Sequence, residues 1–282
     1  MNATDPDRPA ADRSAPAGGT LPAARPVPAV RPAPAGRPTE KSQPAPGVAG
    51  LAPGRAAAFI EARTQRAAVP LVPEIELFVS RAEPTVLWEQ TEQELGCPDL
   101  APPFWAYPWA GGIALARYVL DHPEQVAGRI VLDMAAGSGL VAIAAALAGA
   151  AQVTACDIDP MAAAAIGLNG RANNVTVTIT STDLLAGDLL AAGPVPAGGP
   201  TIADLVLVGD AWYERRLAHR MTGFLTRSRA AGARWLTGDP GRTYLPTAGL
   251  RAVASYAVPV WAGLEDTDVK QTTVWEPAPA AC

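Results

Sequence analysis

The stretch that decides the fold is Arg129-Ile-Val-Leu-Asp-Met-Ala-Ala-Gly-Ser-Gly-Leu-Val-Ala-Ile-Ala-Ala-Ala-Leu-Ala-Gly149. Its first five residues are a short apolar run ending in an acid, which is typical of a buried strand. Residues 140–149 are apolar and rich in Ala, which favours a helix. Between them, two glycines in a run of small residues indicate a tight turn. The segment therefore predicts a strand that turns directly into a helix.

The same alternation continues toward the C-terminus. Strands are predicted at residues 152–157, 175–180, 203–209 and 234–237, with helices at residues 160–173 and 214–231. A short helix over residues 250–254 and closing strands over residues 255–260 and 272–276 would follow. Strict alternation predicts an α/β, Rossmann-like fold: a doubly wound, mostly parallel sheet with helices on both faces. Ligands of such sheets bind beyond the carboxyl ends of the strands.

Two regions precede this core. Residues 1–54 contain no aromatic residue and consist largely of Pro, Ala and Gly, so they cannot bury enough apolar area to offset the entropy of ordering and are predicted to be a disordered tail. The remaining residues, 55–282, would form one domain. Its first part, residues 55–127, is an N-terminal extension with helices predicted at residues 56–67, 87–95 and 113–121 and an aromatic-rich loop at residues 102–112; residues 128–282 are the Rossmann-like core.

Composition and charge exclude several classes of protein. Residues 1–54 carry six basic and four acidic side chains, which leaves the domain with a net charge of −7 and disfavours nucleic acid as a partner. The longest apolar run is too short to span a bilayer and the N-terminus lacks a secretory leader, so we expect a cytoplasmic protein without a membrane partner. Cys97, Cys156 and Cys282 have no metal-ligand spacing, and only two histidines accompany them, so no metal site is predicted.

The glycine turn leaves two nucleotide cofactors open. Gly137-Ser-Gly139-Leu-Val-Ala142, with Asp157 about 20 residues on, satisfies the dinucleotide pattern of a nicotinamide-dependent dehydrogenase. It equally fits the acid-x-G-x-G-x-G turn of S-adenosylmethionine-dependent methyltransferases, with Ala135 at the first glycine. An acid directly before the turn would repel a pyrophosphate but attract the ammonium group of an amino-acid-bearing cofactor. Further acids after the third and fourth strands also suit a sulfonium, so residues 55–282 are predicted to be a methyltransferase domain that binds S-adenosyl-L-methionine.

A closer resemblance runs over about residues 57–276. The motifs that carry it are Phe104-Trp-Ala-Tyr-Pro-Trp-Ala-Gly-Gly112, Val131-Leu-Asp-Met-Ala-Ala-Gly-Ser-Gly139, Cys156-Asp-Ile-Asp-Pro160, Val208-Gly-Asp-Ala-Trp-Tyr213, Leu236-Thr-Gly-Asp-Pro-Gly-Arg242 and Gln271-Thr-Thr-Val-Trp275. In these motifs the chain resembles, in bacterial form, the class I lysine methyltransferases that act on the β subunit of electron-transfer flavoprotein. Two segments depart from the family pattern: the turn holds less glycine, and Glu214-Arg-Arg-Leu217 is less acidic than usual.

The resemblance assigns a set of cofactor-binding residues. Gly137 and Gly139 would let the backbone approach the cofactor, Asp133 would lie at its methionine end, and Asp157 would accept both ribose hydroxyls. Asp183 is expected near the adenine amino group. The aromatic loop would contribute Trp105 and Trp109 as a wall and Gly111, with Gly112, as room for the methionine moiety. Each also has a packing interpretation, as core tryptophans, a helix cap or a structural acid.

The resemblance also assigns Asp210 and Tyr213 as catalytic residues, because they match the acid-x-x-aromatic motif after the fourth strand. A carboxylate at Asp210 would hold the substrate ammonium and orient it rather than act as a strong base, since it raises the pKa of the amine. The implied function is protein-lysine methylation, with electron-transfer flavoprotein β subunit as the protein partner. The alternatives are methylation of a small-molecule amine or a ribosomal protein, and a non-catalytic cofactor-binding module that acts through partners.

Overall fold

The computed structural model describes residues 53–97, 100–186, 203–260 and 267–279, all within one compact unit. The tail predicted over residues 1–54 lies outside the described residues, except for Pro53 and Gly54, which begin the first helix. The N-terminal extension consists of α1 (Pro53–Arg63), β1 (Gln65–Val69), β2 (Val72–Val79), α2 (Pro84–Leu95), a 3-10 turn (Phe104–Ala106) and α3 (Ala110–Asp121). A second 3-10 turn, Pro123–Gln125, leads into the core.

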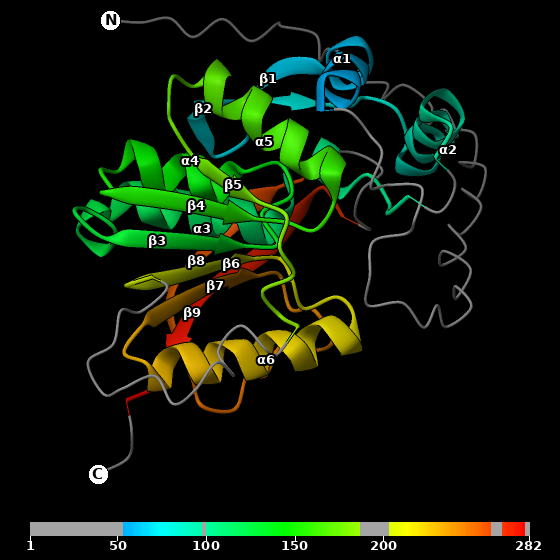
Figure 1. Cartoon of the computed structure of the whole chain (residues 1–282). Helices are drawn as coiled ribbons and strands as arrows, with labels where there is room; N and C mark the ends of the chain where they lie inside the picture. Colours follow the sequence, from blue (N-terminus) through cyan, green and yellow to red (C-terminus); the bar gives the residue numbers. More distant parts are fainter. Residues whose placement is uncertain (1–52, 98–99, 187–202, 261–266, 280–282) are drawn as a thin grey trace, which may run out of the picture. The chain divides into compact units, whose positions relative to one another are not determined.

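The described elements of the core follow the predicted order of strands and helices up to the fifth strand. Its elements are β3 (Ile130–Met134), α4 (Leu140–Leu147), β4 (Gln152–Cys156), α5 (Pro160–Ala172), β5 (Thr178–Thr180), β6 (Leu205–Gly209), α6 (Arg215–Ala230), β7 (Arg234–Asp239), β8 (Leu250–Pro259) and β9 (Val269–Pro277). Figure 1 shows these core strands as neighbours, from β5 beside α5 to β7 near α6.

The strand order distinguishes this sheet from a dinucleotide-binding one. Seven strands of the described chain lie in the order β5-β4-β3-β6-β7-β9-β8. The first five are parallel, whereas β9 is antiparallel to both β7 and β8. Counted from β3, the order is 3-2-1-4-5-7-6, while the dinucleotide-binding order is 3-2-1-4-5-6. The reversed pair at the end of the sheet therefore argues against a dehydrogenase.

The helix predicted over residues 250–254 is wrong. This segment is the start of β8, which pairs with β9 from Leu250 opposite Pro277 to Pro259 opposite Val269. Alanines made the segment read as helical, but its backbone groups are satisfied by the neighbouring strand, and this distant pairing overrides local propensity. The predicted closing strands are thus two long strands that extend the sheet.

The first predicted helix is also too long. Instead of continuing to residue 67, α1 ends at Arg63, and Gln65–Val69 forms β1, antiparallel to β2. Arg66 on β1 pairs with Glu76 on β2 across the hairpin. The alternating apolar and acidic residues of β2 fit this arrangement, since Ile75, Leu77 and Val79 are buried.

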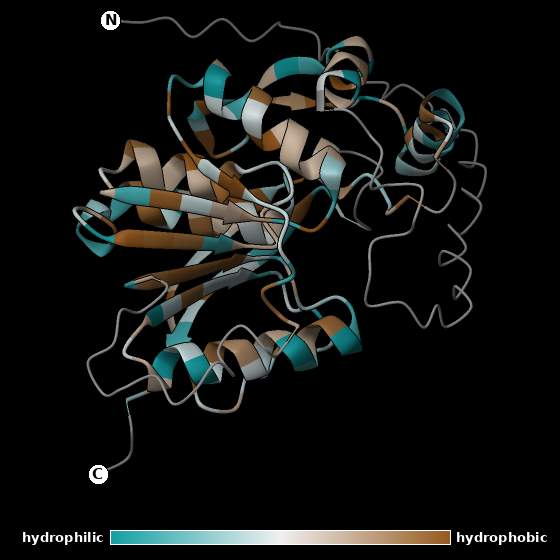
Figure 2. Cartoon of the chain, in the orientation of Figure 1, coloured by the Kyte–Doolittle hydropathy of each residue, from teal (hydrophilic) through white to brown (hydrophobic). Residues whose placement is uncertain are grey.

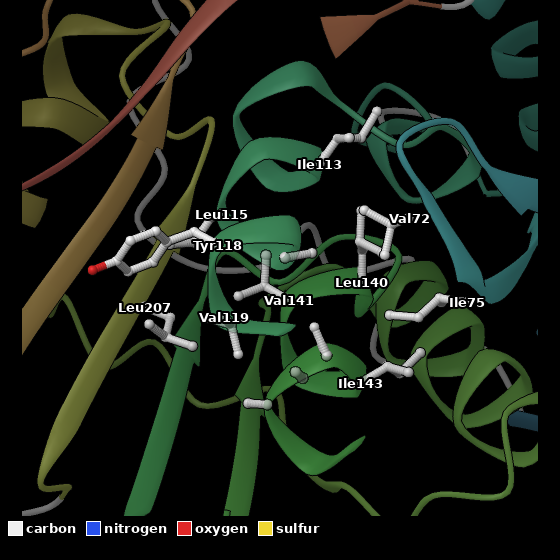
Figure 3. Packing of buried hydrophobic residues seen from close by; sticks show 14 of the residues in the cluster. Val72, Ile75, Ile113, Leu115, Tyr118, Val119, Leu140, Val141, Ile143 and Leu207 are labelled. Carbon is white, nitrogen blue, oxygen red and sulfur yellow. The ribbon is translucent and has the colours of Figure 1, made fainter. Parts of the chain in front are cut away.

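Buried side chains pack on both faces of the sheet. On β3, Val131 packs in one cluster with α3 and α4, while Leu132 and Met134 pack in another with α6, as the period of two in a strand requires. Figure 2 shows β3 and β6 largely in the brown of apolar residues. Figure 3 shows how β2, α3, α4 and β6 contribute to one shared core. The N-terminal extension is therefore packed onto the sheet.

Candidate functional site

Four acidic residues meet at one edge of the sheet. Strands β3, β4, β6 and β7 are mutually parallel, so their carboxyl ends lie together. Asp133 lies near the end of β3, Asp157 follows β4, Asp210 follows β6, and Asp239 ends β7. This is the edge at which ligands of open α/β sheets bind.

The turn after β3 has the backbone that its glycines predicted. Gly137 and Gly139 have φ values of 52° and 81°, in the left-handed region that glycine tolerates. A Cβ on Gly139 would lie 3.1 Å from Cγ1 of Ile166, so this glycine also allows α4 and α5 to approach. A Cβ on Gly137 would meet only the Phe104 carbonyl oxygen, at 3.8 Å. The turn thus lies close to the aromatic loop.

The carboxylate of Asp157 is held in one orientation. Its Oδ2 accepts a hydrogen bond from the Gly137 amide at 2.8 Å, and its Oδ1 accepts one from the Asp159 amide at 3.0 Å. A carboxylate has about four acceptor positions, so two remain for the adjacent hydroxyls of a ribose. Burial raises the pKa of Asp157, and the two amides partly offset that rise. The geometry fits the role that the sequence predicted.

The residues that follow Asp157 complete this part of the site. Asp159 caps α5, because its Oδ1 accepts a hydrogen bond from the Met161 amide at 2.8 Å. Ile158 lies between the two acids and is 57% exposed. An exposed apolar side chain beside the carboxylate of Asp157 would suit the flat face of an adenine. Sequence reasoning missed Ile158, although an apolar residue between two polar strand-end acids was a usable signal.

Asp133 is the most deeply buried acid of the site. It is 1% exposed, and its Oδ2 accepts a hydrogen bond from the Ala142 amide, in the first turn of α4, at 3.0 Å. Burial, and then the charge of Asp157, raise the pKa of Asp133 to about 8. A bound ammonium group would favour its charged form, so this carboxyl suits the amino-acid end of S-adenosylmethionine.

Two predicted cofactor residues have other partners. Asp183 forms an ion pair with Arg220 of α6, with 2.6 Å between Oδ2 and Nη2, and also accepts the Leu185 amide. Trp105 is 1% exposed and packs in a cluster with residues of α1, α2 and α5. We therefore interpret Trp105 as a core residue and Asp183 as a link between the loop after β5 and α6.

The exposed ring of the aromatic loop is Phe104, the residue before Trp105. Phe104 is 37% exposed, and its ring centroid lies 5.7 Å from that of Trp109 and 5.3 Å from that of Tyr213. The Trp109 indole donates to the Phe104 carbonyl oxygen at 2.9 Å. Phe104, Trp109 and Tyr213 thus form an aromatic wall, and such faces favour cations. Nothing in the residue pattern of the aromatic loop distinguishes Phe104 from Trp105 as the exposed ring.

Tyr213 is the member of this wall on which the charges of the site's acids act. It is 46% exposed, yet desolvation of the phenol and then the carboxylates of Asp157, Glu214 and Asp210 raise its pKa above the ordinary value. The phenol is therefore neutral at physiological pH. Tyr213 thus lies within reach of the charges of both Asp157 and Asp210.

Asp210 is buried and held from three sides. Its backbone is left-handed, with φ 56°, and its amide donates to the Gly238 carbonyl oxygen at 2.9 Å. Its Oδ2 accepts the Gly111 amide at 2.9 Å, and Arg242 donates to both carboxylate oxygens. Gly111, predicted to make room for the cofactor, instead supports Asp210 and packs against Gly238.

These residues fit S-adenosylmethionine better than a dinucleotide. They offer a fixed carboxylate for a ribose, an exposed apolar side chain for an adenine, a buried carboxyl for an ammonium group and an aromatic wall for a cation. Two phosphates at the same edge would lie among the carboxyl groups of Asp133, Asp157 and Asp210, and those of the three that are ionised repel phosphate. Over the described ranges, no group of three His, Cys, Asp or Glu side chains is arranged to hold a metal ion.

Known proteins with similar sequences support this interpretation. Residues 114–195 match the family model of ribosomal protein L11 methyltransferase (PrmA). The electron transfer flavoprotein beta subunit lysine methyltransferase of Xenopus laevis is 35% identical over 77% of this chain and 85% of its own length. The Danio rerio protein of the same name is 36% identical (73% and 76% covered), and the Homo sapiens protein is 34% identical (77% and 80% covered).

Among solved structures, a putative RNA methyltransferase from Pyrococcus horikoshii has a TM-score of 0.43 at 14% identity and covers 64% of this chain and 91% of its own. That likeness adds nothing to the assignment, which rests on the sequence relatives and the site. The chain belongs to the electron transfer flavoprotein beta subunit lysine methyltransferase family and is an S-adenosylmethionine-dependent methyltransferase.

Proposed function

We propose that this enzyme is a protein-lysine N-methyltransferase whose substrate is the beta subunit of electron transfer flavoprotein. The observation that carries the proposal is the juxtaposition of the aromatic wall, which includes Tyr213, with Asp210 at the edge of the sheet that fits the cofactor. The relatives named for this activity match most of the chain. The match to the L11 methyltransferase model, in contrast, ends at residue 195, before Asp210 and Tyr213. It therefore supports cofactor binding and says nothing of the substrate.

In this proposal each group of residues has one task. S-adenosylmethionine, when bound, supplies a methyl group already activated by a sulfonium. Gly137 and Gly139 would let it approach the backbone closely, Asp157 would hold its ribose and Asp133 its ammonium group, and the aromatic wall would offer its faces to the sulfonium cation. Asp210 and Tyr213 orient the substrate amine for in-line attack, so that alignment and exclusion of water provide the rate enhancement.

The proposal also includes where the enzyme is located and which class of macromolecule it binds. We propose a cytoplasmic location, in keeping with the buried thiols of Cys97 and Cys156. In the part of the chain that the structure describes, no helix is long and apolar enough to cross a membrane. The net charge of −7 outside residues 1–54 supports a protein partner over a nucleic acid.

Transfer of label tests the proposal. Purified enzyme is incubated with radiolabelled S-adenosylmethionine and electron transfer flavoprotein, and label is expected on the beta subunit. Substituting arginine for the labelled lysines should remove it. Asp157→Ala serves as the inactive variant and Glu61→Gln, an exposed acid on α1, as the matched control that keeps activity.

The other outcomes separate the alternatives. If the enzyme binds S-adenosylmethionine in a calorimeter but labels only a ribosomal protein or a small amine, the substrate proposal is wrong and the methyltransferase assignment stands. If wild-type enzyme binds the cofactor and labels no acceptor in a cell extract, a non-catalytic module becomes the better interpretation.

A further inference from the structure

The carboxylate expected to hold the substrate amine is already paired with an arginine. Arg242 donates from Nε to Asp210 Oδ1 at 2.7 Å and from Nη2 to Asp210 Oδ2 at 3.2 Å. The two residues are 32 positions apart, and Asp210 is almost completely buried in this pair. Such a bidentate guanidinium–carboxylate pair is strong and directional.

A second carboxylate fixes the position of the arginine. Oδ1 of Asp239, at the end of β7, accepts the Gly241 and Arg242 amides at 2.7 Å each. Asp239 is buried, and its pKa is raised to about 6 by burial first. The turn after β7 is thereby held so that the side chain of Arg242 points back to Asp210. Arg242 is thus part of the site's framework.

The charges around Asp210 explain why an arginine is needed there. The groups whose charges act on Tyr213 and Asp239 are Asp157, Glu214, Asp210 and Arg242, from the ends of four different elements. Among these groups of the described chain, Arg242 is the cation and the others are acidic. A lysine entering a site of carboxylates alone would be stabilised as its ammonium ion, which has no lone pair to attack with.

We propose that Arg242 is a positioning residue that keeps Asp210 in place and offsets its charge, so that the substrate amine loses its proton at a lower pH than it would beside an unpaired carboxylate. The inference rests on the proposed function, in which a lysine amine is the acceptor. In the reaction, the ammonium first releases one proton to water. The nitrogen lone pair then forms the N–C bond while the C–S bond breaks and its electron pair stays on sulfur.

The test is the pH dependence of kcat at saturating beta subunit and S-adenosylmethionine, which reports groups in the enzyme–substrate complex, measured with wild type and three variants. Removing the cation with Arg242→Gln should shift the midpoint of the profile up by about one pH unit. Asp210→Asn, which leaves the cation unopposed, should shift it down. The double variant Arg242→Gln/Asp210→Asn should return close to the wild-type midpoint. Opposite shifts that cancel are the signature of charge compensation.

Further variants separate charge from structure. Arg242→Lys keeps the charge but loses the bidentate geometry, so its midpoint should stay near that of wild type while kcat falls. The effect of Arg242→Gln should appear mainly in kcat at neutral pH, because an unpaired Asp210 still binds an ammonium ion. Arg251→Gln is the matched control: Arg251 pairs with Glu276 at the other end of β8 and β9 from the site.

Each outcome decides the inference. Equal midpoints in all variants, or shifts of Arg242→Gln and Asp210→Asn in the same direction, would overturn it and leave Arg242 a structural residue. Arg242→Gln could fail to fold without ending the test. The inference is then supported if the midpoint of the pH profile moves to lower pH in Asp210→Asn and stays in place in Arg242→Lys. An unchanged midpoint in Asp210→Asn overturns the inference. If wild type methylates no site on the beta subunit at any pH, the proposed substrate is wrong and the inference falls with it.

Discussion

The backbone amide of Gly111 donates to Oδ2 of Asp210 across 2.9 Å and so joins the first turn of α3 to the end of β6. The approach requires a glycine. A Cβ at position 111 would lie 2.3 Å from the Gly238 carbonyl oxygen and 2.7 Å from the Asp210 amide nitrogen, both backbone atoms. The geometry of the acidic residue proposed to meet the substrate is therefore set by how closely α3 packs on the sheet.

Gly111→Ala should therefore destabilise the enzyme and reduce methyl transfer. Relieving the clash requires a shift of α3 or β7, and overpacking of this kind costs about 1–3 kcal/mol. Chemical denaturation measures the free energy of unfolding. Gly112→Ala is the matched control, since its Cβ would meet only Val141 and Leu140 side-chain atoms at 3.9 and 4.0 Å. Equal losses in both variants would contradict the close-approach explanation.

Asp133→Asn should change the pH dependence of stability. The folded-state pKa of about 8 lies above the ordinary 3.8, so the stability contributed by the protonated form is full below pH 3.8 and is lost as the pH rises toward 8. Asn preserves the acceptor for the Ala142 amide but cannot ionise. Between pH 4 and 8 the unfolding free energy of the variant should therefore fall less than that of the wild type. Parallel curves would show that Asp133 ionises normally.

Asp133→Asn should also weaken the binding of S-adenosylmethionine. If the carboxyl receives the cofactor's ammonium group, wild type releases a proton on binding S-adenosylmethionine at pH 7, because pairing favours the charged form. Calorimetry in buffers of different ionisation enthalpy detects that proton. The variant should bind more weakly and release none; an unchanged proton count would place the ammonium elsewhere.

Asp157 and Asp183 should differ in their importance for cofactor binding. Asp157→Ala removes a carboxylate oriented for two hydrogen bonds and should lower the affinity for S-adenosylmethionine by at least about tenfold. Asp183→Asn breaks the pair with Arg220 and should change that affinity by less than about threefold. Calorimetric titration of both variants checks this order. A larger loss in Asp183→Asn would restore its predicted place near the adenine.

Phe104 should contribute to turnover through its aromatic face. Phe104→Leu keeps an apolar side chain but removes the ring beside Trp109 and Tyr213, and a lost cation–π contact of about 0.5–2 kcal/mol lowers kcat/KM by about two- to thirtyfold. Phe104→Trp should retain most of the activity. A leucine variant as active as the tryptophan variant would rule out the aromatic contribution.

The parallel core was predictable because its signals are local. Strands β3, β4, β6 and β7 are short apolar runs, each followed by a turn or an acid, and Asp159-Pro160 marks the start of α5. The strand-end position of Asp133, Asp157 and Asp210 brings them to one edge once the strands are parallel. The sequence therefore located this edge of the sheet without knowledge of side-chain contacts.

The features that could not be predicted depend on distant pairing. Alanines in β1 and β8 favour a helix locally, but β2 and β9 supply strand partners. Phe104 and Trp105 are neighbours in one 3-10 turn. The side chain of Phe104 faces the site, whereas that of Trp105 is buried in the core. The pairing of Asp210 with Arg242 depends on a turn held by Asp239, which the spacing alone does not reveal.

The most direct measurement is the mass of the electron transfer flavoprotein beta subunit purified from cells that contain this enzyme and from otherwise identical cells that lack it. The proposed function predicts that the subunit carries methylated lysines in the first cells, located by peptide mapping, and none at those positions in the second. Restoring wild-type enzyme should restore the methyl groups, whereas Asp157→Ala should not. A beta subunit with the same mass in both cells would contradict the proposed substrate.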